Sequence, residues 1–388
     1  MTHSEPEPAA ARAATAAARE DQIAKQTDVE RRTDRARGLM LGLALGESTG
    51  LGRHQSGSPT INAGVATQLA AFTLEGYIRA AVRFSHRGIC HPPSVIWRAY
   101  CRWGIGQGID GLHASAMPGS GGDRSGWLCH VPALRERRGD APRTVAALLG
   151  GRQGTIAEPL NSSMGWHGLV RTLPLIVGHW RDLRFDPSLT RDVTALTHGS
   201  PLALDVSSAA VAIGASLQRG DDVLDGLRTG TDAVRDLGMD PRLTEACDRA
   251  IADAVSGAPS ERDGGDTASE SLRVETLRAV APDATAWSAL LGALIVVATH
   301  PKPGQFVDAL ELAVQAPEGA AVASVTGALL GAAHGASALP VDLVSRHELA
   351  WALDTLTRDA VAQLTDSPGG SEYVEARDER WNRRCPGY

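Results

Sequence analysis

The sequence repeats one kind of segment, about a dozen residues of small and aliphatic side chains that begin at a proline or an N-capping residue and end near a glycine. The clearest example starts at Pro201 and ends at Gly220, with apolar residues at spacings of three and four that share one face of an α-helix. The same pattern predicts helices over 92–103, 142–149, 286–300, 306–315, 322–333 and 347–364. Sustained alternation of β-branched residues is missing from the sequence. We therefore predict an all-α fold.

Length and composition set the domain organisation. The chain has 388 residues, more than the roughly 250–300 at which a single core usually stops growing, so we expect one large domain with tails or two domains. We predict a flexible N-terminal tail over 1–35, a helical domain over 36–365 and a C-terminal tail over 366–388. Loops or insertions are expected near 104–140 and 256–269, where glycine, proline and polar residues concentrate.

Two segments with regularly spaced glycines and alanines predict a close helix contact. They are GLMLGLALGESTG, which starts at Gly38, and TGALLGAAHG, which starts at Thr326. Residues without bulky side chains at this spacing let two helix backbones approach closely. The pattern is explained by packing and needs no functional role.

Charge and cysteine content exclude several classes of protein. The formal net charge is −7, and the nearest approach to a basic stripe is the short stretch 380–384, so we expect no nucleic-acid partner. Five cysteines without a C-x-x-C pair argue against a disulfide framework or a structural zinc site and favour a reducing, cytoplasmic setting. The N-terminus does not resemble a secretory signal, and the longest apolar run, 286–299, is shorter than the roughly 20 residues of a membrane span. We expect a soluble protein without a membrane partner.

Four segments, taken in order, resemble the ADP-ribosylglycohydrolase family. They are RGLMLGLALGESTG at 37–50, NSSMGWHGLVRTLPL at 161–175, ALTHGSPLA at 195–203 and AVASVTGALLGAAHG at 321–335. The resemblance implies an orthogonal bundle of helices around a two-magnesium site that hydrolyses ADP-ribosyl bonds.

The metal motifs of that family are degenerate in this chain. The resemblance implies a Thr-Asp-Asp motif where this chain has Gly64, Val65 and Ala66, and an Asp-x-Asp-Thr motif where it has 318–321, with Glu318 as the only carboxylate. Magnesium needs several oxygen ligands. We therefore predict no metal ligand and no cofactor, although the family uses magnesium.

Other family positions also differ. Glu47 stands at the usual aspartate of the first segment, His54 replaces an acidic residue of a mobile flap, and Met164 replaces a lysine. Glu47, His54 and Glu318 are the candidates for catalysis. General acid–base work would require two titratable groups on either side of one bond. For Glu47, a capping role on a helix is the competing interpretation.

The candidate substrate-binding residues lie in the second and third segments. They are Ser163, Gly165, His167, Gly168, Arg171 and His198. The glycines let backbone amides approach a diphosphate beside a helix N-terminus, and the resemblance places the Thr-His-Gly turn on the adenosine side. The competing interpretation is a glycine-bearing loop and an ordinary N-cap turn.

Three functions remain open. The first is a pseudoenzyme-like protein that binds ADP-ribose or a related nucleotide without magnesium chemistry. The second is an active hydrolase of an ADP-ribose glycosidic bond with an altered centre. The third is a structural or partner-binding protein whose cleft is filled by Met164, Trp166 and His167, with no particular protein partner indicated.

Overall fold

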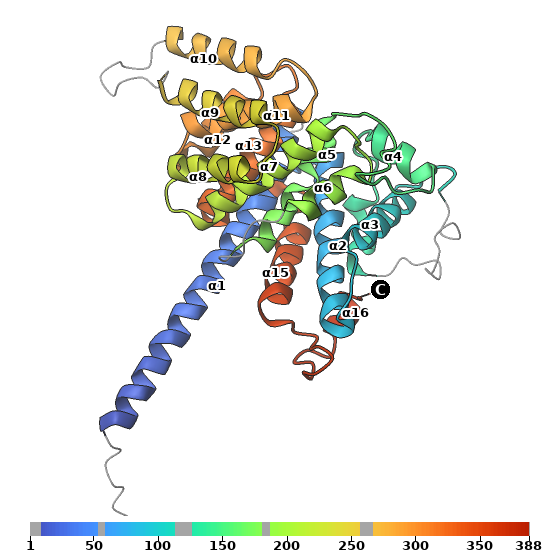
Figure 1. The fold of residues 1–388 in the computed structure, drawn as a ribbon, viewed down its shortest axis with the longest axis vertical. Helices are drawn as coiled ribbons and strands as arrows, with labels where there is room; N and C mark the ends of the chain where they lie inside the picture. Colours follow the sequence, from blue (N-terminus) through green and yellow to red (C-terminus); the bar gives the residue numbers. More distant parts are fainter. Residues whose placement is uncertain (1–8, 53–58, 113–125, 181–186, 257–266, 388) are drawn as a thin grey trace, which may run out of the picture.

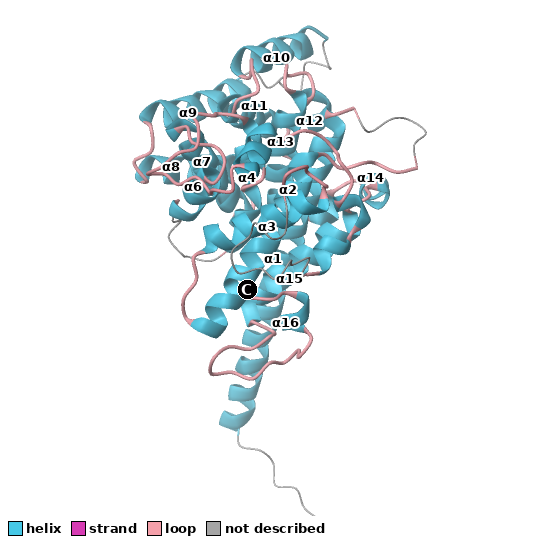
Figure 2. Ribbon diagram, turned by 90° about the vertical axis from the view of Figure 1, so that its right-hand side faces the viewer, coloured by secondary structure: helices cyan, strands magenta, loops and turns pink. Residues whose placement is uncertain are grey.

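The computed structural model describes residues 9–52, 59–112, 126–180, 187–256 and 267–387. Figure 2 shows helices joined by loops and no strand in these ranges. The only β-type pairings there are two isolated bridges, Ile61 with His347 and Gly165 with Thr285. The predicted all-α fold is confirmed.

Fifteen of the described helices position the core and the candidate site. They are α1 (Ala9–Gly50), α2 (Val65–Arg87), α3 (Pro92–Gly106), α4 (Pro142–Leu149), α5 (Trp166–Val170), α6 (Ser188–Ala195), α7 (Pro201–Arg219), α8 (Val223–Asp236), α9 (Pro241–Ser256), α10 (Thr267–Val280), α11 (Ala286–Thr299), α12 (Phe306–Ala313), α13 (Gly319–His334), α14 (Val341–Arg346) and α15 (Ala350–Asp366). A short helix, α16 (Trp381–Arg384), and five 3-10 turns at 127–130, 132–134, 173–178, 303–305 and 336–338 complete the described elements.

The predicted helices agree with this list to within a few residues at their ends. Helix α7 begins at the predicted Pro201, and α4 has the predicted bounds. Helix α13 starts three residues earlier than predicted, at Gly319. Helices α8, α9 and α10 carry charged residues on wide exposed faces, and their lower apolar content did not mark them in the sequence.

Helices α1 and α13 pack against each other through the spaced glycines. A Cβ atom on Gly42 would collide with the Gly327 carbonyl, and a Cβ on Gly327 would collide with the Gly42 carbonyl. Gly38 and Gly331 form an equivalent pair one turn away. The two segments singled out in the sequence therefore make the close contact that their spacing predicts.

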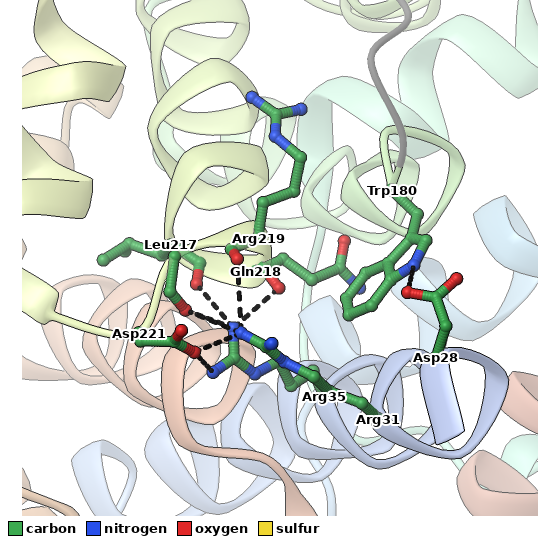
Figure 3. Close-up of polar contacts among 9 residues, drawn as sticks. Asp28, Arg31, Arg35, Trp180, Leu217, Gln218, Arg219 and Asp221 are labelled. Atoms are coloured by element: carbon green, nitrogen blue, oxygen red, sulfur yellow. Dashed lines mark hydrogen bonds and ion pairs between the residues drawn. The ribbon is translucent and has the colours of Figure 1, made fainter. Parts of the chain in front are cut away.

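The N-terminal part of α1 extends away from the remaining helices (Figure 1). Its attachment begins at Asp28, whose carboxylate accepts a hydrogen bond of 3.1 Å from Trp180 Nε1 (Figure 3). About two turns further along α1, Arg35 Nη1 donates to the carbonyls of Leu217 and Gln218 at 3.4 and 2.9 Å. Both carbonyls lie at the C-terminus of α7. A cation at that end of a helix is favourable because carbonyls there lack partners. Helix α1 thus continues without a break through the boundary predicted at residue 35.

The C-terminal residues return to the body of the protein. Trp381 is buried, and its indole Nε1 donates to Gln363 Oε1 of α15 at 2.8 Å. Arg384 Nε donates to Asp359 Oδ2, also on α15, at 2.7 Å. The predicted C-terminal tail 366–388 therefore includes an anchored segment.

Two chemical properties bear on where such a protein is found. All five cysteines are free. Among the described helices, only α7 is long and apolar enough to cross a membrane by length and composition, and 83% of its apolar window is buried inside the structure. That burial is typical of the central helix of a water-soluble protein.

Candidate functional site

Glu47 caps the N-terminus of α2. Its Oε1 accepts a hydrogen bond from the Ala66 amide at 2.8 Å, and its Oε2 accepts one from the Thr67 amide at 2.7 Å. These amides lie in the first turn of the helix, where backbone donors lack intrahelical partners, and a carboxylate there also opposes the positive end of the helix dipole. The Glu47 side chain is almost fully buried. The structure thus gives Glu47 a capping position, whatever further role it has.

The three positions of the first degenerate motif surround this carboxylate. Gly64 precedes α2, and a Cβ atom on it would overlap the Glu47 carboxyl group. Val65 and Ala66 are buried, with exposed fractions of 5% and 0%. The family resemblance implies oxygen ligands at these three positions. In this structure they form an apolar surface around a carboxylate that already accepts two amide hydrogens.

A segment within the loop predicted near 104–140, to which the sequence assigned no role, covers the start of α2. Gln68 Nε2 donates to the carbonyls of Ala133 and Glu136, both at 2.9 Å. Arg138 forms a 2.6 Å ion pair with Glu348, and Glu348 Oε1 also accepts from the Ala63 amide at 2.9 Å. These contacts join residues that are far apart in the sequence and follow no local motif, so no sequence signal could have revealed them.

Glu318 lies at the start of α13, immediately before Gly319. It is half-buried, and its carboxylate has no hydrogen bond or ion pair among the described residues. The end of α1 packs on the same turn, because a Cβ on Gly50 would collide with Ala320. Both motif positions therefore lie beside the C-terminal end of α1.

The donor set at these two helix starts does not fit a pair of magnesium ions. It consists of Glu47, which is engaged by two amides, and Glu318. In the described part of the chain, no group of three or more His, Cys, Asp or Glu side chains could hold a metal ion. Two hard cations would need several more oxygens. Of the catalytic candidates, His54 lies outside the described residues.

The second and third resemblance segments come together in space. Asn161 Nδ2 donates to the Thr197 carbonyl at 3.0 Å, while its Oδ1 accepts from the Ser163 amide at 2.9 Å. The Ser163 hydroxyl in turn accepts from the Gly165 amide at 3.3 Å. Asn161 therefore organises both loops, and α5, which follows them, contacts α2, α7, α11 and α13.

His198 packs its imidazole against the two glycines of the second segment. A Cβ on Gly168 would lie 2.9 Å from His198 Cγ, whereas a Cβ on Gly165 would lie 3.5 Å from His198 Nε2, an ordinary contact distance. Nδ1 of His198 is 2.8 Å from the Thr197 hydroxyl. Burial, followed by the nearby positive charge of Arg171, holds the pKa of His198 well below its usual range. The ring is therefore neutral at neutral pH.

His167 stacks on Trp166, with ring centroids 3.9 Å apart and an angle of 21° between the planes. Burial, together with the charge of Arg171, lowers the pKa of His167 to about 4. Trp166 is buried. The stacked pair fixes the start of α5 and leaves His167 half-buried as a neutral hydrogen-bonding group.

Arg171 faces the protein interior. It is fully buried, and its Nη2 donates to the carbonyls of Val193 and Thr194 at the end of α6, at 2.9 and 3.1 Å. Its guanidinium lies 4.8 Å from the centroid of the Tyr100 ring, a cation–π arrangement. Of the substrate-binding candidates, Arg171 is therefore placed to hold α5 against α6 and α3, and a ligand would reach it only through its neighbours.

The helices and the two joined loops define an all-α protein with a candidate ligand site at several helix starts. The sequence profile of the family described as ADP-ribosylglycohydrolase matches residues 28–378. The chain belongs to the ADP-ribosylglycohydrolase family.

Comparison with solved structures supports the same fold. A structure described as an ADP-ribosylglycohydrolase-related protein complex is similar with a TM-score of 0.54 and 19% sequence identity. The similarity covers 87% of this chain and 100% of that chain. No curated protein matches the sequence.

Proposed function

We propose that this protein binds ADP-ribose or a related nucleotide and does not carry out the two-magnesium hydrolysis of its family. One observation carries the proposal: the Glu47 carboxylate accepts the amides of Ala66 and Thr67 at the helix start where the family pattern implies metal ligands. The helix terminus is thereby neutralised by the protein itself. A cytoplasmic location belongs to the same proposal and is supported by the five free cysteines.

Ligand binding is supported by the two loops that Asn161 holds together. Ser163 and Gly165 are half-buried and lie beside the neutral ring of His198. A hydroxyl and a neutral imidazole are groups that bind the phosphate and sugar oxygens of a nucleotide. Gly168 and Arg171 are assigned positioning roles, since Gly168 packs under His198 and Arg171 holds α5 in place.

The test is calorimetric titration of the full chain with ADP-ribose, with and without magnesium, together with an assay for release of ADP-ribose from a modified protein. We expect the same affinity in EDTA and in magnesium, and no turnover. The proposal fails if millimolar ADP-ribose gives neither heat nor a rise in melting temperature, because a ligand of the folded state must stabilise it.

A matched pair of variants locates the binding. Gly165→Ala is compatible with the fold, since its Cβ would meet its neighbours at 3.5 Å, but it places a methyl group where a ligand would approach the backbone. We expect it to weaken ADP-ribose binding at least tenfold. Gly304→Ala is the control, because a Cβ there meets nothing within 4 Å.

An altered hydrolase is the second candidate function. It is favoured by Glu318, whose half-buried carboxylate has no partner among the described residues and is therefore available to a substrate or a water molecule. It predicts turnover that Glu318→Gln abolishes. Turnover that survives this substitution would remove Glu318 from the mechanism.

A further inference from the structure

A basic cavity lies between the second half of α2 and the helix α3. Its volume is about 270 Å³, and four arginines line it: Arg79, Arg83, Arg98 and Arg102. The two helices are in contact along their length and lie side by side in Figure 1. With a rise of 1.5 Å per residue, Arg83 is about 25 Å along α2 from its capped start, so this cavity is separate from the candidate site around Glu47.

The buried side of the cavity is an ion-paired cluster. Glu75 pairs with Arg79 through one carboxylate oxygen and with Arg102 through the other. All three residues are buried, with Arg102 8% exposed. Nε of Arg102 has no hydrogen-bond partner in the described part of the chain. A buried donor without an acceptor costs free energy. An anionic oxygen bound in the cavity could accept this hydrogen bond and would stabilise the protein.

The open side of the cavity carries charge without compensation. Arg83 is half-buried and Arg98 is exposed, and neither has an ion pair or hydrogen bond among the described residues. No carboxylate is among the described residues that line the cavity. A second cavity of about 270 Å³ is also lined by Arg83, and its described lining adds His86 and Arg87 and again no acid. Like charges gathered in this way repel one another unless an anion lies between them.

The start of α3 adds further polar groups to the wall. His91 and Ser94 line the cavity, and His91 Nδ1 is 2.8 Å from the Ser94 hydroxyl. The positive end of the helix dipole is directed to the same place. Ile89 and Val95 supply an apolar part of the lining.

We propose that this cavity binds the phosphate or pyrophosphate group of a small phosphorylated molecule. Guanidinium groups match phosphate oxygens in geometry and keep their charge at any physiological pH. The volume is slightly below the roughly 300–1,000 Å³ of pockets for drug-sized ligands, so the occupant is a compact molecule. Its non-phosphate part would rest on Ile89 and Val95.

Calorimetric titration of the full chain with inorganic pyrophosphate, in magnesium-free buffer at constant ionic strength, tests this site. Arg83→Gln/Arg98→Gln removes two cations that hold no structural contact, so folding should be preserved, as circular dichroism will verify. We expect the dissociation constant for pyrophosphate to rise about tenfold or more, because one hydrogen bond between a guanidinium and the anion contributes at least the free energy of a tenfold change in affinity. Arg228→Gln/Arg249→Gln changes the charge equally on the exposed faces of α8 and α9 and should alter binding less than about twofold, since salt screens distant charges.

Three results would overturn the proposal. The first is the absence of heat with pyrophosphate up to millimolar concentration. The second is an equal loss of affinity in the Arg228/Arg249 control, which would show a general charge effect. The third is binding of a single-stranded oligonucleotide that depends on Arg83 and Arg98, without binding of pyrophosphate, which would make the cavity part of a nucleic-acid site. Loss of pyrophosphate binding in Arg83→Gln/Arg98→Gln, with ADP-ribose binding retained, separates this cavity from the proposed ADP-ribose site.

Discussion

The carboxyl group of Glu47 fills the space that a side chain at position 64 would occupy. Gly64 therefore allows Glu47 to reach the amides at the start of α2, and the longer side chain at position 47 excludes a threonine at position 64. Capping of α2 by Glu47 and the lack of a side chain at position 64 are thus two aspects of one packing arrangement.

A double-mutant cycle should measure this dependence. Glu47→Ala leaves two buried amides without their acceptor, so we expect the free energy of unfolding to fall by about 2 kcal/mol or more. Gly64→Ala should cost about 1–3 kcal/mol through overlap with the Glu47 carboxyl. In the double variant the overlap is gone, so chemical denaturation should show a total loss smaller than the sum of the two. Strict additivity would contradict the contact.

The glycine contact between α1 and α13 makes a prediction of unusual sign. Replacing a helical glycine by alanine normally stabilises a helix by about 0.5–1 kcal/mol. Gly42→Ala should instead destabilise the protein by about 3 kcal/mol, because its Cβ would meet the Gly327 backbone, which cannot rotate away. Gly106→Ala in α3 is the control, since the nearest neighbour of its Cβ is 4.0 Å away. The melting temperature of Gly42→Ala should fall, while that of Gly106→Ala should rise or stay unchanged. A rise for Gly42→Ala would refute the close packing.

His347 should make stability depend on pH. Its Nδ1 accepts from the Leu349 amide at 3.2 Å, and its Nε2 lies 3.2 Å from the Ser48 hydroxyl, so the neutral ring is the form that fits. Burial lowers its pKa to about 4, from about 6.5 in the unfolded chain.

The unfolded state therefore binds a proton that the folded state refuses, and stability falls as the pH drops below 6.5. For this group alone the loss is about 2 kcal/mol between pH 7 and pH 5. Urea unfolding at both pH values should show that His347→Gln removes this part of the slope. If the free energy of unfolding of the variant depended on pH as strongly as that of the wild type, other groups would be responsible for the dependence.

Gly168 offers a test of His198 that does not touch its side chain. Gly168→Ala brings a Cβ to 2.9 Å from the His198 ring, so the ring must shift. Under the proposed function, ADP-ribose affinity should fall about tenfold or more, with the secondary structure retained. Pyrophosphate binding at the arginine cavity is the internal control, and a simultaneous loss of both would indicate general unfolding.

Much of the fold followed from local patterns. Proline before and glycine after an apolar stripe marked α7, because these residues act on the backbone where they stand. The contact between Gly42 and Gly327 could be anticipated because both sides carry the same spacing. The family resemblance, rather than spacing alone, brought Asn161 and the Thr197 turn into one site.

Other features depended on contacts between distant residues. Arg171 looked like a ligand group from its motif, but its direction is set by Tyr100 and by the end of α6. The cover of α2 by 133–138 and the ion pair of Arg138 with Glu348 join segments that share no pattern. The arginine cavity arises because Arg79 and Arg83 face Arg98 and Arg102 across two helices, which no single-segment reading reveals.

The continuity of α1 has a consequence for how this site can change. Glu47 belongs to the same rigid helix as Gly38 and Gly42, so its carboxylate cannot move along α2 unless α1 slides over α13. A slide of less than one helical turn would move Gly38 and Gly42 away from the Gly331 and Gly327 backbones that they fit against. The place of Glu47 at the start of α2 is therefore set by the packing of α1 on α13 as well as by its own two hydrogen bonds.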